Sequence, residues 1–299
     1  SIGMIDEGFL ERLKPGDVFL LGGDTYQFKF SRGLVAQVSA TSNRPPTVPH
    51  WVSEQLPLSF DLATSIGGLR QELHQRFSKK EKEEFVKEET KKLLHVSDDV
   101  SSAIVSYAKE QFDYCGIIPH YHHILIEFVA EEKRAIFHMG YGRRVSDCLS
   151  RAVAFVIARK YHKDVELTMN DYGFSISGIT RDQASESFAL LKKEKLDLLM
   201  NSAIEGSEVY KRRFRHCAAR ALMILRNYLG RQKRVGRQQV SSMILLAALK
   251  RISNDFTILK EARREVLEDL MDIESAKTVL EWIETGRTKV SVIETSMLS

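Results

Sequence analysis

Within the first forty residues, hydrophobic side chains gather in three short strand-like runs, at residues 17–21, 25–30 and 34–39, and they alternate with polar side chains in the second run. A period of two is typical of β-strands, and the glycine-containing segments between the runs are typical of hairpin turns. A small barrel closes a few short strands economically, so we expect a small N-terminal β-barrel within residues 1–57.

Helical spacing of the hydrophobic residues begins near residue 58. The pattern predicts three helices, at 60–77, 79–94 and 97–112, which form a helical connector over residues 58–113. The middle helix is rich in both lysine and glutamate, and such a mixture indicates a solvent-exposed helix face.

Alternation returns in two predicted hairpins, at residues 124–139 and 165–179, which flank a long helix ending at Tyr161. This order predicts an α+β unit of winged-helix type over residues 114–182. Residues 183–299 are predicted to form a basic helical bundle, with a possible last strand at 288–293. The predicted fold class is therefore α+β.

The composition is that of an ordinary soluble protein, with 43% hydrophobic and 28% charged residues. No apolar run approaches the ~20 residues that a membrane span needs. The chain has 3 cysteines, without the spacing of a disulfide framework or a zinc ribbon. A reduced, cytoplasmic setting is expected, with no membrane partner.

Positive charge is concentrated between Val209 and Asn254, a stretch that contains 12 Lys or Arg residues and no Asp or Glu, although the whole chain carries only +4. Such a segment favours a polyanion, and nucleic acid is the first candidate. The alternative is a solvated face of scattered surface charge, which is less attractive because the segment has no acids of its own.

A helical projection separates this segment into two sides. The apolar side contains Phe214, Cys217, Ala218, Ala221, Ile224, Leu225 and Tyr228. The opposite side contains Arg212, Arg213, Arg220 and Arg226. We therefore expect the segment to pack inward and to present arginines, whose planar guanidinium groups suit phosphate oxygens, to solvent.

Two further features concern ion binding. His120, His122, His123 and His138 lie close in sequence, but no carboxylate or cysteine stands at ligand spacing, so we predict ordinary strand histidines and no metal site. Glycines before the long helix, followed by Arg143 and Arg144, suit either a phosphate site at a helix N-terminus or a simple turn.

Asp171 lies in the segment Asn170-Asp-Tyr-Gly173. Among the residues considered, Asp171 is the best candidate for a general base. The same residue types are those that a tight hairpin turn requires, and the turn is favoured.

Trp51 ends a segment stiffened by Pro45, Pro46 and Pro49. Its indole suits either an anchor on the barrel or an exposed wedge that stacks on bases, and the residues alone do not separate the two.

Several motifs occur together in one order along the chain. They are Arg44-Pro-Pro-Thr-Val-Pro-His-Trp51, Leu56-Pro-Leu-Ser-Phe-Asp61, His138-Met-Gly-Tyr-Gly-Arg-Arg-Val145, Asn170-Asp-Tyr-Gly-Phe174, Phe214-Arg-His-Cys-Ala-Ala-Arg220, Gly236-Arg-Gln-Gln239 and Ala262-Arg-Arg-Glu-Val-Leu-Glu-Asp269. In combination they resemble the DEAD/DEAH-associated region, C-terminal to the motor, of the large helicase-related (Lhr) family of superfamily 2 helicases, and most closely its archaeal members. The bacterial pattern after Trp51 differs from the Val52-Ser-Glu54 found here.

The resemblance implies that the parent protein is an ATP-dependent helicase that translocates 3′-to-5′ on single-stranded DNA and unwinds DNA duplexes and RNA:DNA hybrids in repair or recombination. It implies that Trp51 contacts a base. The RecA-like motor and winged-helix domains are missing from this sequence, so ATP and Mg would be cofactors of the parent and none is expected for this module. No phosphate-binding loop of the G-x-x-x-x-G-K-[ST] type is present.

We therefore interpret the chain as a nucleic-acid-binding module that does no chemistry by itself. The predicted contact residues are Trp51, Arg143, Arg144, Lys211, Arg212, Arg213, Arg215, Arg220, Arg226, Arg231, Lys233, Arg234 and Arg237. Two alternatives stay open: a glycosylase-like base-excision module with Asp171 as the catalytic residue, and a basic protein-interaction platform.

Overall fold

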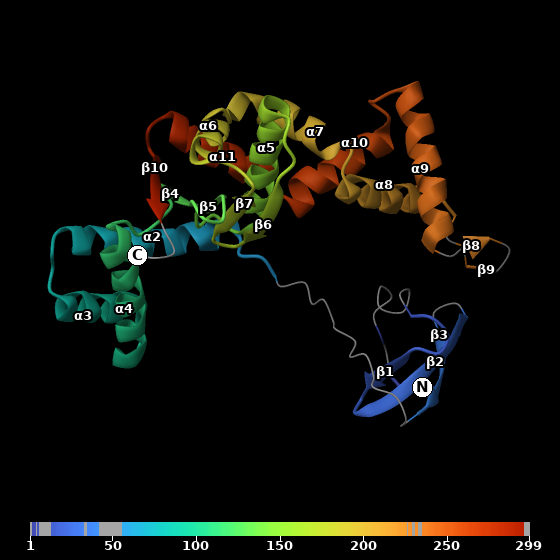
Figure 1. Ribbon diagram of the computed structural model, residues 1–299, viewed down its shortest axis with the longest axis horizontal. Helices are drawn as coiled ribbons and strands as arrows, with labels where there is room; N and C mark the ends of the chain where they lie inside the picture. Colours follow the sequence, from blue (N-terminus) through green and yellow to red (C-terminus); the bar gives the residue numbers. More distant parts are fainter. Residues whose placement is uncertain are drawn as a thin grey trace. The chain divides into compact units, whose positions relative to one another are not determined.

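The computed structural model describes residues 2–3, 5, 13–32, 35–41, 56–225, 227–228, 231–232 and 235–295 (Figure 1). The chain forms two compact units. One comprises residues 1–56 and 227–233, and the other comprises residues 57–226 and 234–299. The predicted four-part division of the chain remains a prediction.

The first unit contains an antiparallel meander of β1 (Val18–Leu21), β2 (Asp24–Arg32) and β3 (Val35–Ala40). Phe19, Tyr26 and Phe28 form its buried core. The three predicted strands are thus confirmed, but the described residues form an open sheet and no closed barrel, because only three strands pair there. The short β8 (Asn227–Tyr228) and β9 (Arg231–Gln232) pair with each other as a separate hairpin.

The second unit is built around a five-stranded sheet with the order β10-β4-β5-β7-β6. Its strands are β4 (His123–Val129), β5 (Arg134–His138), β6 (Glu166–Asn170), β7 (Gly173–Ser177) and β10 (Lys289–Thr295). The two hairpins were predicted from the sequence. The last strand was also predicted, and it joins the sheet parallel to β4, with Lys289 opposite His123.

One face of this sheet packs on α5 (Arg143–Tyr161), as Figure 1 shows. Ile124, Ile126 and Phe137 of the sheet share one core with Leu149 and Val153 of α5.

A separate small core lies within α2 (Phe60–Ser78), α3 (Glu83–Leu94) and α4 (Asp98–Cys115), the predicted helical connector.

The C-terminal helices extend the main core instead of forming a bundle of their own. They are α6 (Arg181–Ala189), the 3-10 turn η1 (Lys193–Lys195), α7 (Leu196–Ile204), α8 (Glu208–Arg220), α9 (Val235–Ile252), α10 (Thr257–Arg264), the π-helical η2 (Glu265–Leu270) and α11 (Ile273–Glu284). The prediction of a separate bundle was wrong because the apolar faces of these helices pack continuously with α5 and the sheet.

Candidate nucleic-acid interface

Helix α8 carries the first part of the basic segment. Ser207 caps it by accepting a hydrogen bond from the Tyr210 backbone N–H, at 3.2 Å. Phe214, Cys217, Ala218 and Ile224 are buried, as predicted for the apolar side, whereas Ala221 and Leu225 of the same predicted side are exposed. The helix nevertheless ends at Arg220 and not beyond it, because Leu222 adopts φ 57° and the chain turns back.

A groove of about 340 Å³ separates α8 from α9. Its α8 wall consists of Glu208, Val209, Lys211, Arg212 and Arg215, and its α9 wall consists of Gln239, Ser242 and Met243. One cation and one acid of this groove neutralise each other, because Lys211 Nζ lies 2.6 Å from Glu208 Oε1.

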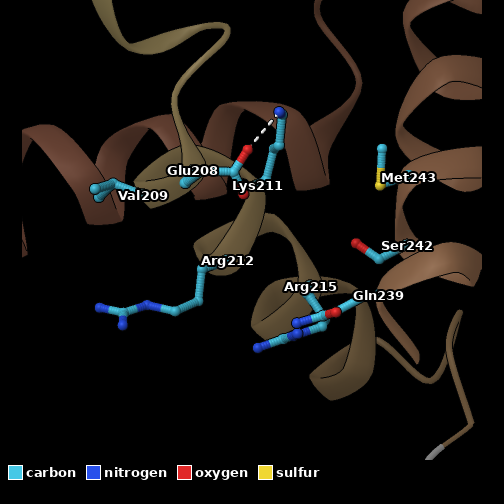
Figure 2. A pocket seen from close by; sticks show the side chains of 8 residues that line it. All are labelled: Glu208, Val209, Lys211, Arg212, Arg215, Gln239, Ser242 and Met243. Carbon is cyan, nitrogen blue, oxygen red and sulfur yellow. Dashed lines mark hydrogen bonds and ion pairs between the residues drawn. The ribbon is translucent and has the colours of Figure 1, made fainter. Parts of the chain in front are cut away.

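Arg212 and Arg215 are the groove cations without such a partner. Neither makes an ion pair or a hydrogen bond through its side chain within the part of the chain that the structure describes. Figure 2 shows both guanidinium groups pointing away from the Lys211–Glu208 pair. Arg212 is exposed and Arg215 half-buried, so both remain available to an anion.

Arg213 and Arg220 behave differently, which corrects the prediction that they simply face solvent. Both are paired with Glu265, whose residue exposure is only 4%. Arg213 Nη1 lies 3.7 Å from Glu265 Oε2, and Arg220 donates to the other carboxylate oxygen. Replacing these arginines is therefore expected to lower stability, contrary to what their helical positions alone suggest.

The acid-free segment is thus partly neutralised by acids from outside it. Lys250 of α9 pairs with Glu205, at 3.0 Å, in addition to the pairs that Glu208 and Glu265 make. Fewer positive charges are therefore available to bind an anion in the folded chain than the count of Lys and Arg in this segment suggests.

The arginines at the start of α5 also divide into two kinds. Arg144 donates to the carbonyl oxygens of Glu268 and Met271, so it ties α5 to the segment before α11. The Arg143 side chain is exposed and has no partner among the described residues, whereas its backbone N–H donates to Asp171.

Asp171 lies in the predicted hairpin turn between β6 and β7. Its Oδ1 accepts the backbone N–H groups of Leu58, at 2.9 Å, and of Arg143, at 3.1 Å. The carboxylate therefore holds the entry to α2 against the N-terminus of α5. The cavity beside it measures only about 10 Å³, roughly the space that one water molecule needs.

Of the four predicted strand histidines, His123 and His138 lie in strands, whereas His120 and His122 precede β4. His138 Nε2 lies 2.8 Å from Glu127 Oε2, and the His122 ring packs against Tyr121 and Trp282. His120 and His123 instead meet His74 of α2, which was not among the predicted histidines.

Burial favours the neutral form of the imidazoles of His74, His120 and His123. Burial, and then the neighbouring imidazoles, lower the pKa of His120 to about 4. Burial also lowers the pKa of His74 and, with Lys289 nearby, that of His123.

The remaining predicted contact residues are not tested by the structure. Trp51, Arg226, Lys233 and Arg234 lie outside the described residues, and the side chains of Arg231 in β9 and Arg237 in α9 do as well.

A helix long and apolar enough to cross a membrane is absent from the described residues.

Comparison with known proteins identifies the family. The DEAD/H associated family model matches residues 118–299, and the chain belongs to this family. "ATP-dependent helicase Lhr-Core" of Methanothermobacter thermautotrophicus is 44% identical over 100% of this chain and 35% of its own length. "Lhr helicase/ probable uracil glycosylase" of Mycolicibacterium smegmatis is 25% identical over 99% of this chain and 19% of its own length.

The chain therefore spans about a third of the length of the more similar relative. One solved structure, "Structure of Mycobacterium smegmatis helicase Lhr bound to ssDNA and AMP-PNP", matches 86% of this chain and 32% of its own, with a TM-score of 0.69 and 24% identity, which shows a shared fold. The predicted similarity to the Lhr family is confirmed, and identity is higher to the archaeal relative than to the mycobacterial one.

Proposed function

We propose that this chain is the nucleic-acid-binding module of an Lhr-type ATP-dependent helicase, and that it grips single-stranded DNA along the groove between α8 and α9. The observation that carries the proposal is the pair Arg212 and Arg215, two cations at one groove without partners among the described residues. Exposed arginines of this kind are suited to phosphate oxygens. Arg143 is proposed as a further phosphate contact.

The parent protein is proposed to translocate 3′-to-5′ with ATP and Mg bound to motor domains outside this chain, and to unwind DNA duplexes and RNA:DNA hybrids. This chain contributes grip and no chemistry. Its sequence contains no phosphate-binding loop with which to hold ATP.

The groove is tested with Arg212→Gln/Arg215→Gln in a fluorescence-anisotropy titration with single-stranded DNA at several salt concentrations. We expect affinity to fall about tenfold, because two charge-assisted contacts are lost. If five or so phosphates are neutralised in the parent sequence, log affinity falls with log salt at a slope of about −3 to −4, and the variant flattens that slope by ~1.4. Thermal unfolding stays unchanged.

The matched control is Lys163→Gln/Lys195→Gln, which removes the same charge from two exposed lysines that make no ion pair among the described residues. It should bind like the parent sequence. Equal losses in both variants would show that net charge alone decides binding. If an acidic peptide binds as tightly as the oligonucleotide, the chain is instead a basic protein-interaction platform.

Trp51 is proposed to stack on a base. Replacing it by alanine should weaken binding by ~1 to 3 kcal/mol, or tenfold to a hundredfold. In a Trp282→Phe background, which leaves Trp51 as the one tryptophan of the sequence, DNA binding should quench the tryptophan fluorescence; Trp282 itself packs against Phe60 with ring centroids 5.9 Å apart. If Trp51→Ala unfolds the chain without a selective binding defect, Trp51 is an anchor.

The glycosylase alternative is supported by the names of relatives such as the mycobacterial one. The surroundings of Asp171 weigh against it as the base, because one carboxylate oxygen holds two backbone N–H groups and the adjacent cavity has no room for a nucleobase. Release of uracil from DNA by this chain, abolished by Asp171→Asn, would favour excision.

A further inference from the structure

Three imidazoles, one from α2 and two from the turn that begins β4, converge between α2 and the sheet. One ring nitrogen from each of His74, His120 and His123 lies within 4.8 Å of those of the other two. The ring centroids are 5.6 to 6.1 Å apart. His120 and His123 are buried, and His74 is partly buried.

The backbone holds the three residues in place. His120 and His123 exchange both of their backbone hydrogen bonds, at 3.1 and 2.8 Å, in the turn that begins β4. Helix α2 approaches this turn closely at Gly67, where an added Cβ would lie 3.0 Å from the Tyr121 Cβ. His74 follows Gly67 by two helical turns on the same side of α2, so it faces the same turn.

We propose that His74, His120 and His123 form a binding site for a divalent transition-metal ion, with zinc as the best fit and water completing its coordination. Three imidazole donors with an open position are a common zinc ligand set. No carboxylate or thiolate of a described residue joins the group, so the oxygen-preferring ions magnesium and calcium are not expected there.

The surroundings of the rings suit this role. Ser291 Oγ lies 2.8 Å from His123 Nε2, and a hydroxyl that accepts the Nε2 proton leaves the lone pair of Nδ1 free for a metal. Such a partner behind a ligand fixes both the tautomer and the orientation of the ring.

The other two rings are held more loosely. His74 Nδ1 accepts the Ile118 backbone N–H at 3.3 Å, and His120 Nδ1 accepts that of His122 at 3.2 Å. Both bonds are long, so a metal–nitrogen bond displaces them readily as the rings rotate. Tetrahedral zinc, with Zn–N bonds of ~2.0 to 2.1 Å, needs nitrogens about 3.3 Å apart, which a rotation of this kind supplies.

A bound ion would join two layers of the second unit. His74 belongs to the helical connector, whereas His120 and His123 belong to the turn that leads into strand β4. Metal binding is therefore expected to stabilise α2 against the sheet, since an ion that binds only the folded chain raises its stability.

The test uses the full chain without an affinity tag, after chelator treatment, and zinc alone as the probe. Calorimetry should show one equivalent bound, and cobalt as a substitute should give the intense visible absorption of a tetrahedral site. Thermal unfolding should shift upward with zinc. His120→Gln should lower the zinc affinity at least ~10-fold and abolish the cobalt spectrum.

The matched control is His122→Gln, because His122 lies between the two ligands in sequence but packs against Tyr121 and Trp282. It should bind zinc like the parent sequence. His74→Asn, at a partly exposed helix position, serves as a second ligand variant if His120→Gln is unfolded by circular dichroism. Absence of saturable one-to-one binding, or equal weakening by the His122 variant, would overturn the proposal.

Discussion

The lysine- and glutamate-rich helix α3 and the basic helix α8 differ in where the ion-pair partners of their charged side chains come from. In α3 the partners are one turn apart, as in Lys87–Glu83 at 2.7 Å and Lys92–Glu89 at 3.1 Å. In α8, Arg213 and Arg220 reach a carboxylate from another part of the chain, Glu265 of η2. In α3, a sequence with both lysines and glutamates therefore forms ion pairs within the helix. In α8, a sequence without acids after Glu208 still forms ion pairs, but with a residue far away in sequence.

The energies of the two kinds of pair differ as well. Exposed pairs one turn apart contribute ~0.3 to 0.5 kcal/mol each, because water screens them. Glu265 is buried, so its charge depends on Arg213 and Arg220 for compensation. The Arg213 Nε is itself buried without a hydrogen bond to any described residue, which makes this side chain dependent on the carboxylate that it faces.

Removing Glu265 should have the largest effect on stability. Glu265→Ala should lower the free energy of unfolding by about 3 kcal/mol, since losing one partner of a buried pair leaves uncompensated charge and a gap. The value lies at the low end of the usual range because Arg220 is 62% exposed and can turn to water. Urea unfolding followed by circular dichroism measures the loss.

Glu83→Ala in α3 is the matched change, since it also removes one carboxylate from a lysine or arginine partner. Its cost should stay below about 0.5 kcal/mol. If the two substitutions lower the free energy of unfolding equally, long-range and local ion pairs do not differ in their contribution to stability in this chain.

The comparison also separates what the sequence predicts from what it does not. Both hairpins of the central sheet and the apolar side of α8 follow from periodicity, because neighbouring residues determine them. The parallel pairing of β10 with β4 joins residues more than 150 positions apart, which no local pattern encodes. The barrel prediction was not confirmed for a similar reason: the spacing of the runs predicts the strands, but it does not determine whether they close into a barrel.

The candidate site shows the same division. The positive charge of the segment identified the groove residues Arg212 and Arg215 along with all the other cations. It did not separate them from Arg213 and Arg220, because Glu265 follows in sequence some 45 residues later. His74 was missed for the same reason, and only the close approach of α2 at Gly67 brings it to His120.

A third kind of carboxylate contact, between two strands, gives an expected effect between those of the two alanine substitutions and sharpens the comparison. Glu127 of β4 accepts from His138 of the neighbouring β5 at 2.8 Å. That hydrogen bond, with smaller contributions from Thr295 and Tyr114, lowers the pKa of Glu127 below its ordinary value of 4.5. The ionised form is therefore favoured in the folded chain, so its stabilisation is complete above pH 4.5 and is lost as pH falls through the lowered pKa.

Glu127→Gln should consequently make the free energy of unfolding fall less steeply between neutral pH and pH values below 4.5, where the carboxylate of the parent sequence takes up a proton. The difference should be about 1 kcal/mol, as for a single hydrogen bond to a half-buried group. Urea unfolding at a series of pH values measures it, with Glu83→Gln as the exposed control. If the parent chain and Glu127→Gln lose stability in parallel as the pH falls, the Glu127–His138 contact contributes as little as the screened pairs of α3.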